Sequence, residues 1–482
     1  MMRWMLAVVI GLILGTAQEG NCAERPNVLW IIVDDMSPNF GCYGEKTIQT
    51  PQVDALAKSG VQFTRAFVTA PVCSACRSAL ITGCYQTTIG AHHHRSGRGE
   101  LKLALAPEIA PLPELMQKAG YFTSIGSWPL NQKQGKTDYN FEWDQHIYNS
   151  DDWKDRKPGQ PFFAQIQLHG GKYRDGGGLR PGVKKALKTL TDPATVTLPP
   201  YYPDDPEIRA DWAAYLDSVR YTDMQVGEIL ARLEQENLRD STYVFFMTDH
   251  GISHARGKQF LYDEGIHVPL VVRGPGMKAG EKRGDLTEHI DLAATTLALA
   301  GEKIPEWMQG RNLLAEKSPR KYVFAARDRC DETVEHIRSV RSEEFKYIRN
   351  YLPERPHLQP CLYKDDKPTL KRLRELHEAG KLTGLPEQLL FAPKREAEEL
   401  YDLRNDPFET KNLAKDPQMK QVLETMRKEL TSWEDRTHDL GRLPESEAMY
   451  DSDMAVYLKG HPQRERLQAN IDQMKRWAKE GK

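Results

Sequence analysis

The chain has 482 residues, enough for two or three domains or for one large α/β domain with an appendage. Its formal net charge is −2, so the charge balance argues against a nucleic-acid partner and against an acidic tail. Seven cysteines are too few for a disulfide scaffold, and the sequence leaves open whether any of them pair. These values fit a globular enzyme with long loops.

The N-terminus has the pattern of a secretory signal peptide. Arg3 precedes an apolar run over residues 5–15, and small residues at 21–23 suit cleavage near Ala23, with a lipid-anchored Cys22 as the alternative. No later run reaches the roughly 18 apolar residues of a membrane span, so we expect no stable membrane insertion. Because the chain has no Asn-x-Ser/Thr sequon, we expect export to a bacterial periplasm or exterior rather than to a lysosome.

The mature chain alternates apolar strands with helices. Continuous apolar runs, typical of buried parallel strands, lie at residues 27–33, 61–69, 121–125, 161–168, 242–248 and 268–272. Helical patterns lie at 53–58, 77–82, 112–118, 209–237 and 292–299. Residues 127–140 are polar and irregular, and 170–206 form a surface excursion rich in Gly and Pro. This alternation predicts an α/β fold with a large, mostly parallel sheet sandwiched by helices.

The pattern changes after residue 318. Short strands at 322–326, 337–340 and 346–349 follow one another closely, and charged helices lie at 367–378 and 420–435. We therefore expect a smaller, antiparallel sheet with a helix. The predicted organisation is a signal peptide at 1–23, an α/β domain at 24–318 and a C-terminal α+β subdomain at 319–482.

Acidic residues follow two of the predicted strands. Asp34 and Asp35 end the strand at 27–33, and Asp249 and His250 end the strand at 242–248. Ligands of parallel sheets gather at the carboxyl ends of the strands, so these side chains can meet at one edge. Neighbouring carboxylates repel unless a cation neutralises them, and these ligands suit Ca²⁺ or Mg²⁺, while His250 also admits Mn²⁺ or Zn²⁺. The alternative is that each pair is an ordinary loop or turn.

A cysteine stands at the start of the helix near residue 77. Cys73 lies four residues before Arg77, and a thiolate at a helix N-terminus beside an arginine has a lowered pKa. A cysteine hydrolase is one interpretation, although no orienting group is evident for the histidines at 92–94. A small buried residue is the other.

Together these segments resemble the type I, formylglycine-dependent sulfatases of the alkaline-phosphatase-like superfamily. The resemblance rests on residues 25–35, 50–57, 70–77 with its Cys-x-Ala-x-Arg pattern, 248–251, 261–270 and 399–413. The tail from residue 398 to 439 and the segment at 209–211 are similar to the heparan N-sulfatase (sulfamidase) branch. The match extends over nearly the whole mature chain. It implies a hydrolase of sulfate esters or sulfamates that acts on a sulfated carbohydrate.

The resemblance also implies a mechanism. A maturation enzyme would oxidise Cys73 to formylglycine, whose hydrate attacks sulfur with one hydroxyl and releases sulfate with the other. Arg77 and Lys258 would stabilise charge on the sulfuryl oxygens. The metal, calcium first and Mg²⁺ or Mn²⁺ otherwise, would be held by Asp34, Asp35, Asp249, His250 and residue 73.

Several positions depart from the family's usual pattern. In the family, a Gly-Lys-x-His segment usually follows the strand that corresponds to 121–125, and this chain lacks it there. Lys136 is identified as the matching catalytic lysine, displaced by a short insertion. For the leaving-group acid, His169 ranks before Lys172 because an imidazole titrates near neutrality. Ala75 replaces the more frequent proline, which leaves open the maturation system that acts on Cys73.

Four residues are candidate substrate contacts, namely His93, Lys172, His267 and Glu332. For the loops at 92–95 and 327–332, structural salt bridges are an equally open alternative. Two other functions also stay open. One is a phosphodiester or phosphonate ester hydrolase of the same superfamily. The other is a glycan-binding protein without catalysis, which predicts that Cys73 remains a thiol.

Overall fold

The computed structural model describes residues 25–174, 178–315 and 319–482. The predicted signal peptide at 1–23 lies outside the described residues. In the described part, no helix is both long and apolar enough to span a membrane. The six cysteines of that part all carry free thiols, so none of them pairs with another.

The larger of the two sheets has the strand order β3-β4-β1-β5-β6-β2-β7, with β8 beside β2. Its strands are β1 (Asn27–Val33), β2 (Val61–Phe67), β3 (Phe122–Gly126), β4 (Phe162–Leu168), β5 (Thr242–Thr248), β6 (His267–Arg273), β7 (Glu281–Arg283) and β8 (Thr287–Glu288). Only β6 runs against its neighbours, so the sheet is mostly parallel, as predicted. Every residue of β1 is buried, because helices cover both faces.

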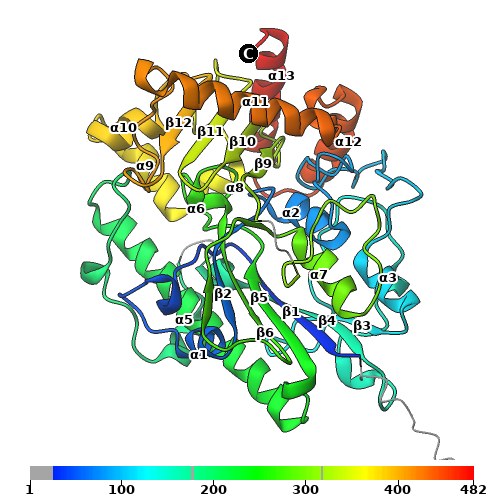
Figure 1. Ribbon diagram of the computed structural model, residues 1–482. Helices are drawn as coiled ribbons and strands as arrows, with labels where there is room; N and C mark the ends of the chain where they lie inside the picture. The colour runs from blue at the N-terminus through cyan, green and yellow to red at the C-terminus, as the bar shows by residue number, and fades with distance from the viewer. Residues whose placement is uncertain (1–24, 175–177, 316–318) are drawn as a thin grey trace, which may run out of the picture.

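The covering helices form one layer on each side of the sheet (Figure 1). On one side lie α1 (Pro51–Ser59) and α5 (Pro206–Gln235), and on the other α2 (Cys73–Thr82), α3 (Leu112–Lys118) and α7 (Asp291–Leu299). The carboxylate of Asp205 caps α5 by accepting hydrogen bonds from its first turn. α2 is buried over its whole length and ends at Gly83, whose φ of +68° favours glycine. The predicted sandwich is confirmed.

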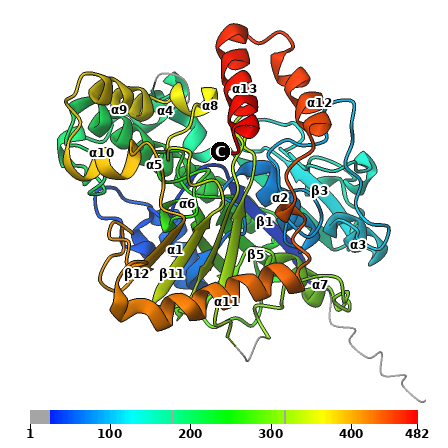
Figure 2. The ribbon, with the colours of Figure 1, turned by 90° about the horizontal axis from the view of Figure 1, so that it is seen from above.

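The smaller sheet is antiparallel, with the strand order β12-β11-β10-β9. Its strands are β9 (Val323–Arg327), β10 (Ile337–Arg341), β11 (Phe345–Asn350) and β12 (Glu398–Asp402). α11 (Lys420–Arg436) lies across these strands (Figure 2), and its Trp433 ring stacks on Phe324 with the ring centroids 5.2 Å apart. The predicted antiparallel sheet with a helix is confirmed, although β12 was not predicted.

Further helices lie in the C-terminal part, in the excursion after β4 and between β5 and β6. They are α4 (Pro181–Leu187), α6 (Asp263–Ile266), α8 (Leu362–Asp365), α9 (Pro368–Glu378), α10 (Gly384–Leu390), α12 (Glu447–Leu458) and α13 (Arg464–Lys479). All strands of the large sheet precede residue 289 and all strands of the small sheet follow residue 322. However, α9 packs against α5 of the large domain. The domain boundary near residue 318 therefore stays a prediction.

Candidate active site

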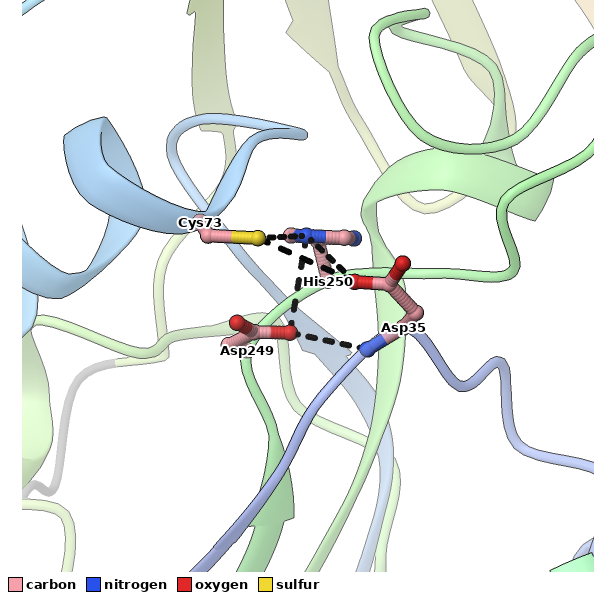
Figure 3. Close-up of side chains that lie close together, drawn as sticks. All are labelled: Asp35, Cys73, Asp249 and His250. Atoms are coloured by element: carbon pink, nitrogen blue, oxygen red, sulfur yellow. Dashed lines mark hydrogen bonds and ion pairs between the residues drawn. The ribbon is translucent and has the colours of Figure 1, made fainter. Parts of the chain in front are cut away.

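The candidate site lies at the edge of the large sheet where β1 and β5 end side by side (Figure 3). Asp249 continues the ladder by donating its backbone N–H to the carbonyl of Val33 at 2.8 Å. Asp35 has a left-handed backbone with a φ of +54°, and its N–H donates to Asp249 Oδ1 at 3.0 Å. The strand register thus brings two acidic pairs that are distant in sequence to one point.

Cys73, the first residue of α2, faces these strand ends. Its Sγ atom lies 3.1 Å from His250 Nε2, 3.2 Å from Lys258 Nζ and 3.7 Å from Asp35 Oδ1. Lys172 Nζ is 3.8 Å from the same sulfur. The sulfur is therefore surrounded by groups of both charges.

The two cysteines of α2, Cys73 and Cys76, differ in pKa. Burial would raise the pKa of Cys73, but Lys136, Lys172 and Lys258 outweigh burial and lower the pKa to about 7. Burial and the Asp249 carboxylate instead raise the pKa of Cys76 well above its usual value. A positive potential therefore acts at the Cys73 sulfur, and the same potential favours an anionic group there.

Asp34 is surrounded by cations. Arg77 and Lys172 pair with its carboxylate, and Lys136 Nζ lies 3.2 Å from Oδ2. Burial would raise the pKa of Asp34, but these three side chains hold it well below its usual range. Arg77 also pairs with Asp249 at 3.1 Å, so its guanidinium links the ends of two strands.

Four side chains present possible metal-ligand atoms within 4.8 Å of one another, namely Asp35, Cys73, Asp249 and His250. Asp34, predicted as a fifth ligand, is not in this group. His250 Nδ1 lies 2.9 Å from the carbonyl oxygen of Gly251. A carbonyl only accepts, so Nδ1 carries a proton, and Nε2 would present its lone pair to a cation once the ring is neutral. Burial would lower the pKa of His250, but Asp249, Cys73 and Asp35 raise it.

Two glycines let the segment after β4 approach Asp34 and Asp35. Gly170 has a φ of +52°, and a Cβ atom there would lie 2.1 Å from the carbonyl oxygen of Asp34. A Cβ on Gly171 would lie 2.2 Å from the carbonyl oxygen of Asp35. The resulting turn directs Lys172 into the cluster, whereas the half-buried ring of His169 packs edge-on against Tyr173 at 5.6 Å. This geometry favours Lys172 over His169, which the sequence ranked first.

Two predicted substrate contacts lie away from the cluster. His267 Nε2 is 3.0 Å from the carbonyl oxygen of Thr64, and its ring stacks on Phe67. His93 Nδ1 accepts a hydrogen bond from the backbone N–H of Arg329 at 3.2 Å. His93 also borders a cavity of about 560 Å³ beneath α13. These contacts are with other parts of the protein, and the substrate roles of both residues stay predictions.

The loop at 92–95 reaches the site through a different histidine. His94 Nδ1 lies 2.7 Å from the hydroxyl of Ser74, the residue after Cys73. Glu332, predicted as a substrate contact, is buried. Its Oε1 accepts a hydrogen bond at 2.6 Å from the backbone N–H of Leu362. Glu332 thus supports the start of α8.

Two residues of the cluster were not predicted from the sequence. The hydroxyl of Tyr363, on α8, lies 3.1 Å from Asp35 Oδ2 and 3.2 Å from Lys258 Nζ. Gln167 accepts a hydrogen bond from Arg77. A signal existed for Gln167, because a polar residue near the end of a wholly buried strand is unusual. Tyr363 lies in a segment for which no element was predicted.

Comparison with known proteins identifies the family. The family model described as sulfatase matches residues 26–302, which is more than half of the chain. The chain belongs to the sulfatase family. It is therefore a sulfuric ester hydrolase, and the resemblance found in the sequence is confirmed. A second model, described as the C-terminal part of N-sulphoglucosamine sulphohydrolase, matches residues 250–367.

Relatives of this sulfatase match most of its length. An ulvan-active sulfatase from Formosa agariphila is 34% identical over 476 residues, covering 89% of this chain and 78% of the relative. The N-sulphoglucosamine sulphohydrolase of Homo sapiens is 28% identical over 483 residues, covering 87% and 92% respectively. A solved 2-O GAG sulfatase structure has a TM-score of 0.61 at 20% identity, covering 89% of this chain and 96% of that chain. This structural likeness shows the fold.

Proposed function

We propose that this sulfatase removes sulfate groups from sulfated carbohydrates, using a formylglycine made from Cys73 and a divalent cation. The observation that carries the proposal is the contact of Cys73 Sγ with His250 and Lys258, beside Asp35, at a buried sheet edge. The names of the two relatives, which refer to ulvan and N-sulphoglucosamine, support the carbohydrate class. A screen of N- and O-sulfated monosaccharides would distinguish N-linked from O-linked sulfate as the substrate group.

Calcium is the cation we propose, with Mg²⁺ and Mn²⁺ as alternatives. The donor set fits, because Asp35 and Asp249 offer buried carboxylate oxygens and His250 offers an imidazole nitrogen beside residue 73. Oxygen donors suit Ca²⁺ and Mg²⁺, while the imidazole also suits Mn²⁺. When bound, such a cation supplies positive charge that polarises the oxygens of the sulfate group.

The cationic side chains of the cluster would bind the sulfate group. Lys172 and Lys258 both contact the Cys73 sulfur, so they border the position at which a sulfate would react. Lys136 lies between Asp34 and Asp138 and pairs with both carboxylates. Because these charges are already fixed, little reorganisation is needed when negative charge develops on the sulfuryl oxygens.

Lys172 is the better supported candidate for the leaving-group acid. Its ammonium contacts the Cys73 sulfur at 3.8 Å, so a proton donor lies beside the reacting position. Burial would lower the pKa of Lys172, but Asp34 and Cys73 raise it, so the ammonium is protonated at neutral pH. We expect Lys172→Ala to lower kcat about 100-fold or more on an alkyl sulfate, and less on an aryl sulfate whose leaving group needs no proton. His169→Ala should stay within a few-fold of wild type. Steady-state kinetics would be measured on both substrates. A loss of kcat that is larger in His169→Ala than in Lys172→Ala, and larger on the alkyl than on the aryl sulfate, would contradict this assignment.

Removing divalent cations is expected to abolish turnover and lower the melting temperature. Asp35 and Asp249 would lose one of the positive charges that offset their repulsion. Ca²⁺ at 100 times its Kd should stabilise the fold by about 2.7 kcal/mol. The protein would be dialysed against a chelator and titrated with Ca²⁺, Mg²⁺ and Mn²⁺ while activity and melting temperature are recorded. Adding the same cations to an Asp249→Ala variant should not change its melting temperature. A wild-type melting temperature that responds to none of the cations would refute the metal site.

Parallel assays test the proposed function. Aryl sulfate and phosphodiester substrates would be compared first, followed by N- and O-sulfated monosaccharides. Turnover of phosphodiesters in preference to sulfates would favour the phosphodiester or phosphonate hydrolase. Mass spectrometry of the residue 73 peptide from native protein should detect formylglycine. An unmodified cysteine would favour the non-catalytic glycan-binding protein.

We also propose export to the periplasm or exterior, with a formylglycine-generating enzyme as the maturation partner. The signal-peptide pattern at residues 1–23 supports export, and the Cys73-to-Arg77 segment supports maturation. N-terminal sequencing of protein from its native source should begin near Glu24. A mature chain that begins at Met1 would contradict the first of these proposals.

A further inference from the structure

A side chain from the C-terminal part of the chain enters the cluster around Cys73. The hydroxyl of Tyr363 lies 3.1 Å from Asp35 Oδ2 and 3.2 Å from Lys258 Nζ. Asp35 and Lys258 in turn lie 3.7 Å and 3.2 Å from the Cys73 sulfur. Tyr363 is therefore connected to residue 73 through two side chains.

The directions of these hydrogen bonds follow from the groups involved. A carboxylate only accepts and an ammonium only donates, so Tyr363 donates to Asp35 and accepts from Lys258. Lys258 also pairs directly with Asp35 at 3.1 Å. The phenol thus bridges a buried ion pair through charge-assisted hydrogen bonds, which are stronger than neutral ones. A phenylalanine would keep the ring and lose both bonds.

The backbone before Tyr363 is held by the C-terminal helices. The N–H of Leu362 donates to Glu332 Oε1 at 2.6 Å, and the same oxygen accepts from Asn470 Nδ2 of α13 at 2.8 Å. The backbone carbonyl of Glu332 also accepts from the hydroxyl of Tyr450 on α12, at 2.8 Å. The start of α8 is consequently fixed to two other helices.

The residue after Tyr363 is tied to the segment that carries Lys258. The buried Lys364 Nζ donates to the carbonyl of His254 at 2.6 Å. The hydroxyl of Ser253, in that segment, also lies 3.4 Å from the hydroxyl of Tyr363. The distance between α8 and Lys258 is therefore set by protein contacts that do not involve a substrate.

We propose that Tyr363 is a positioning residue of this sulfatase, which holds Lys258 toward the sulfate group and Asp35 toward the cation. The inference rests on the proposed function of the cluster. Partners that hold metal ligands in place typically contribute about 10- to 100-fold to metal affinity or activity. We expect Tyr363→Phe to lower kcat by about that factor with KM within a few-fold of wild type.

The experiment compares Tyr363→Phe with Tyr351→Phe in the full-length mature protein. Tyr351 is a matched control, because its hydroxyl also donates to a carboxylate, that of Glu434 at 2.6 Å, at the small sheet. Aryl sulfate kinetics would be corrected for the formylglycine content of each sample, measured by mass spectrometry, and melting temperatures would be compared. Calorimetric titration with Ca²⁺ and no substrate gives a second readout, with an expected Kd about 10-fold weaker in Tyr363→Phe only.

Equal kcat and equal Ca²⁺ affinity in the two variants would overturn the proposal. A loss of melting temperature in Tyr363→Phe that matches Tyr351→Phe, without the loss of kcat, would assign Tyr363 a purely structural role and overturn it as well. If the wild type turned over no sulfate ester, the proposed function would fail. The calorimetric comparison would still decide whether Tyr363 supports the cation site.

Discussion

Replacing Cys73 with alanine is expected to abolish sulfate ester turnover and leave the fold intact. Residue 73 would supply the group that attacks sulfur, and loss of the attacking residue in other hydrolases costs about 10⁶-fold in kcat. We therefore expect a loss of about 10⁴-fold or more on an aryl sulfate. The residue is only 2% exposed, but removing the thiol, or the formyl group made from it, leaves only a small cavity, so the melting temperature should change little.

The matched control for this prediction is Cys84→Ala. Cys84 is also a buried thiol, and burial raises its pKa to about 12, so it resembles Cys73 in size but not in reactivity. We expect the control to keep most of the wild-type kcat with a similar small change in melting temperature. Retained turnover in Cys73→Ala, or equal losses of activity in both variants, would exclude residue 73 as the reacting group.

The core of the site could be predicted because local pattern and topology agree there. The apolar runs of β1 and β5 each end abruptly in a charged pair, and neighbouring parallel strands share one carboxyl edge. Asp35 and Asp249 therefore had to lie close together once the strand types were known. The start of α2 was misjudged by only four residues, which did not affect the position of Cys73.

Contacts that depend on loop geometry could not be predicted in this way. The near-neutral titration of an imidazole ranked His169 before Lys172, and the sequence does not show that Gly170 turns the chain with a positive φ. The contact of Tyr363 with Asp35 joins residues that are 328 positions apart through a helix of four residues. A helix this short has no periodic pattern, so only the tertiary structure reveals the contact.

Arg77→Ala is expected to destabilise the protein as well as inactivate it. The guanidinium is 3% exposed and pairs with Asp34 and Asp249, so its removal leaves two buried carboxylates short of a partner. Breaking a buried ion pair in this way costs about 3–5 kcal/mol in the free energy of unfolding. Lys136 and Lys172 still pair with Asp34, so the loss should lie toward the lower end of this range. Urea unfolding of the cation-free protein at neutral pH measures this difference.

The pH dependence of Arg77→Ala separates lost charge pairing from lost packing. The cations around Asp34 depress its folded-state pKa, so its contribution to stability is present above its unfolded pKa and is lost as pH falls. The difference in unfolding free energy between wild type and Arg77→Ala should therefore be largest at neutral pH and shrink below about pH 4. Arg77→Met, which keeps much of the side-chain volume without the charge, should behave like Arg77→Ala. If the difference in unfolding free energy did not depend on pH, or if Arg77→Met were as stable as the wild type, Arg77 would stabilise the site by packing alone.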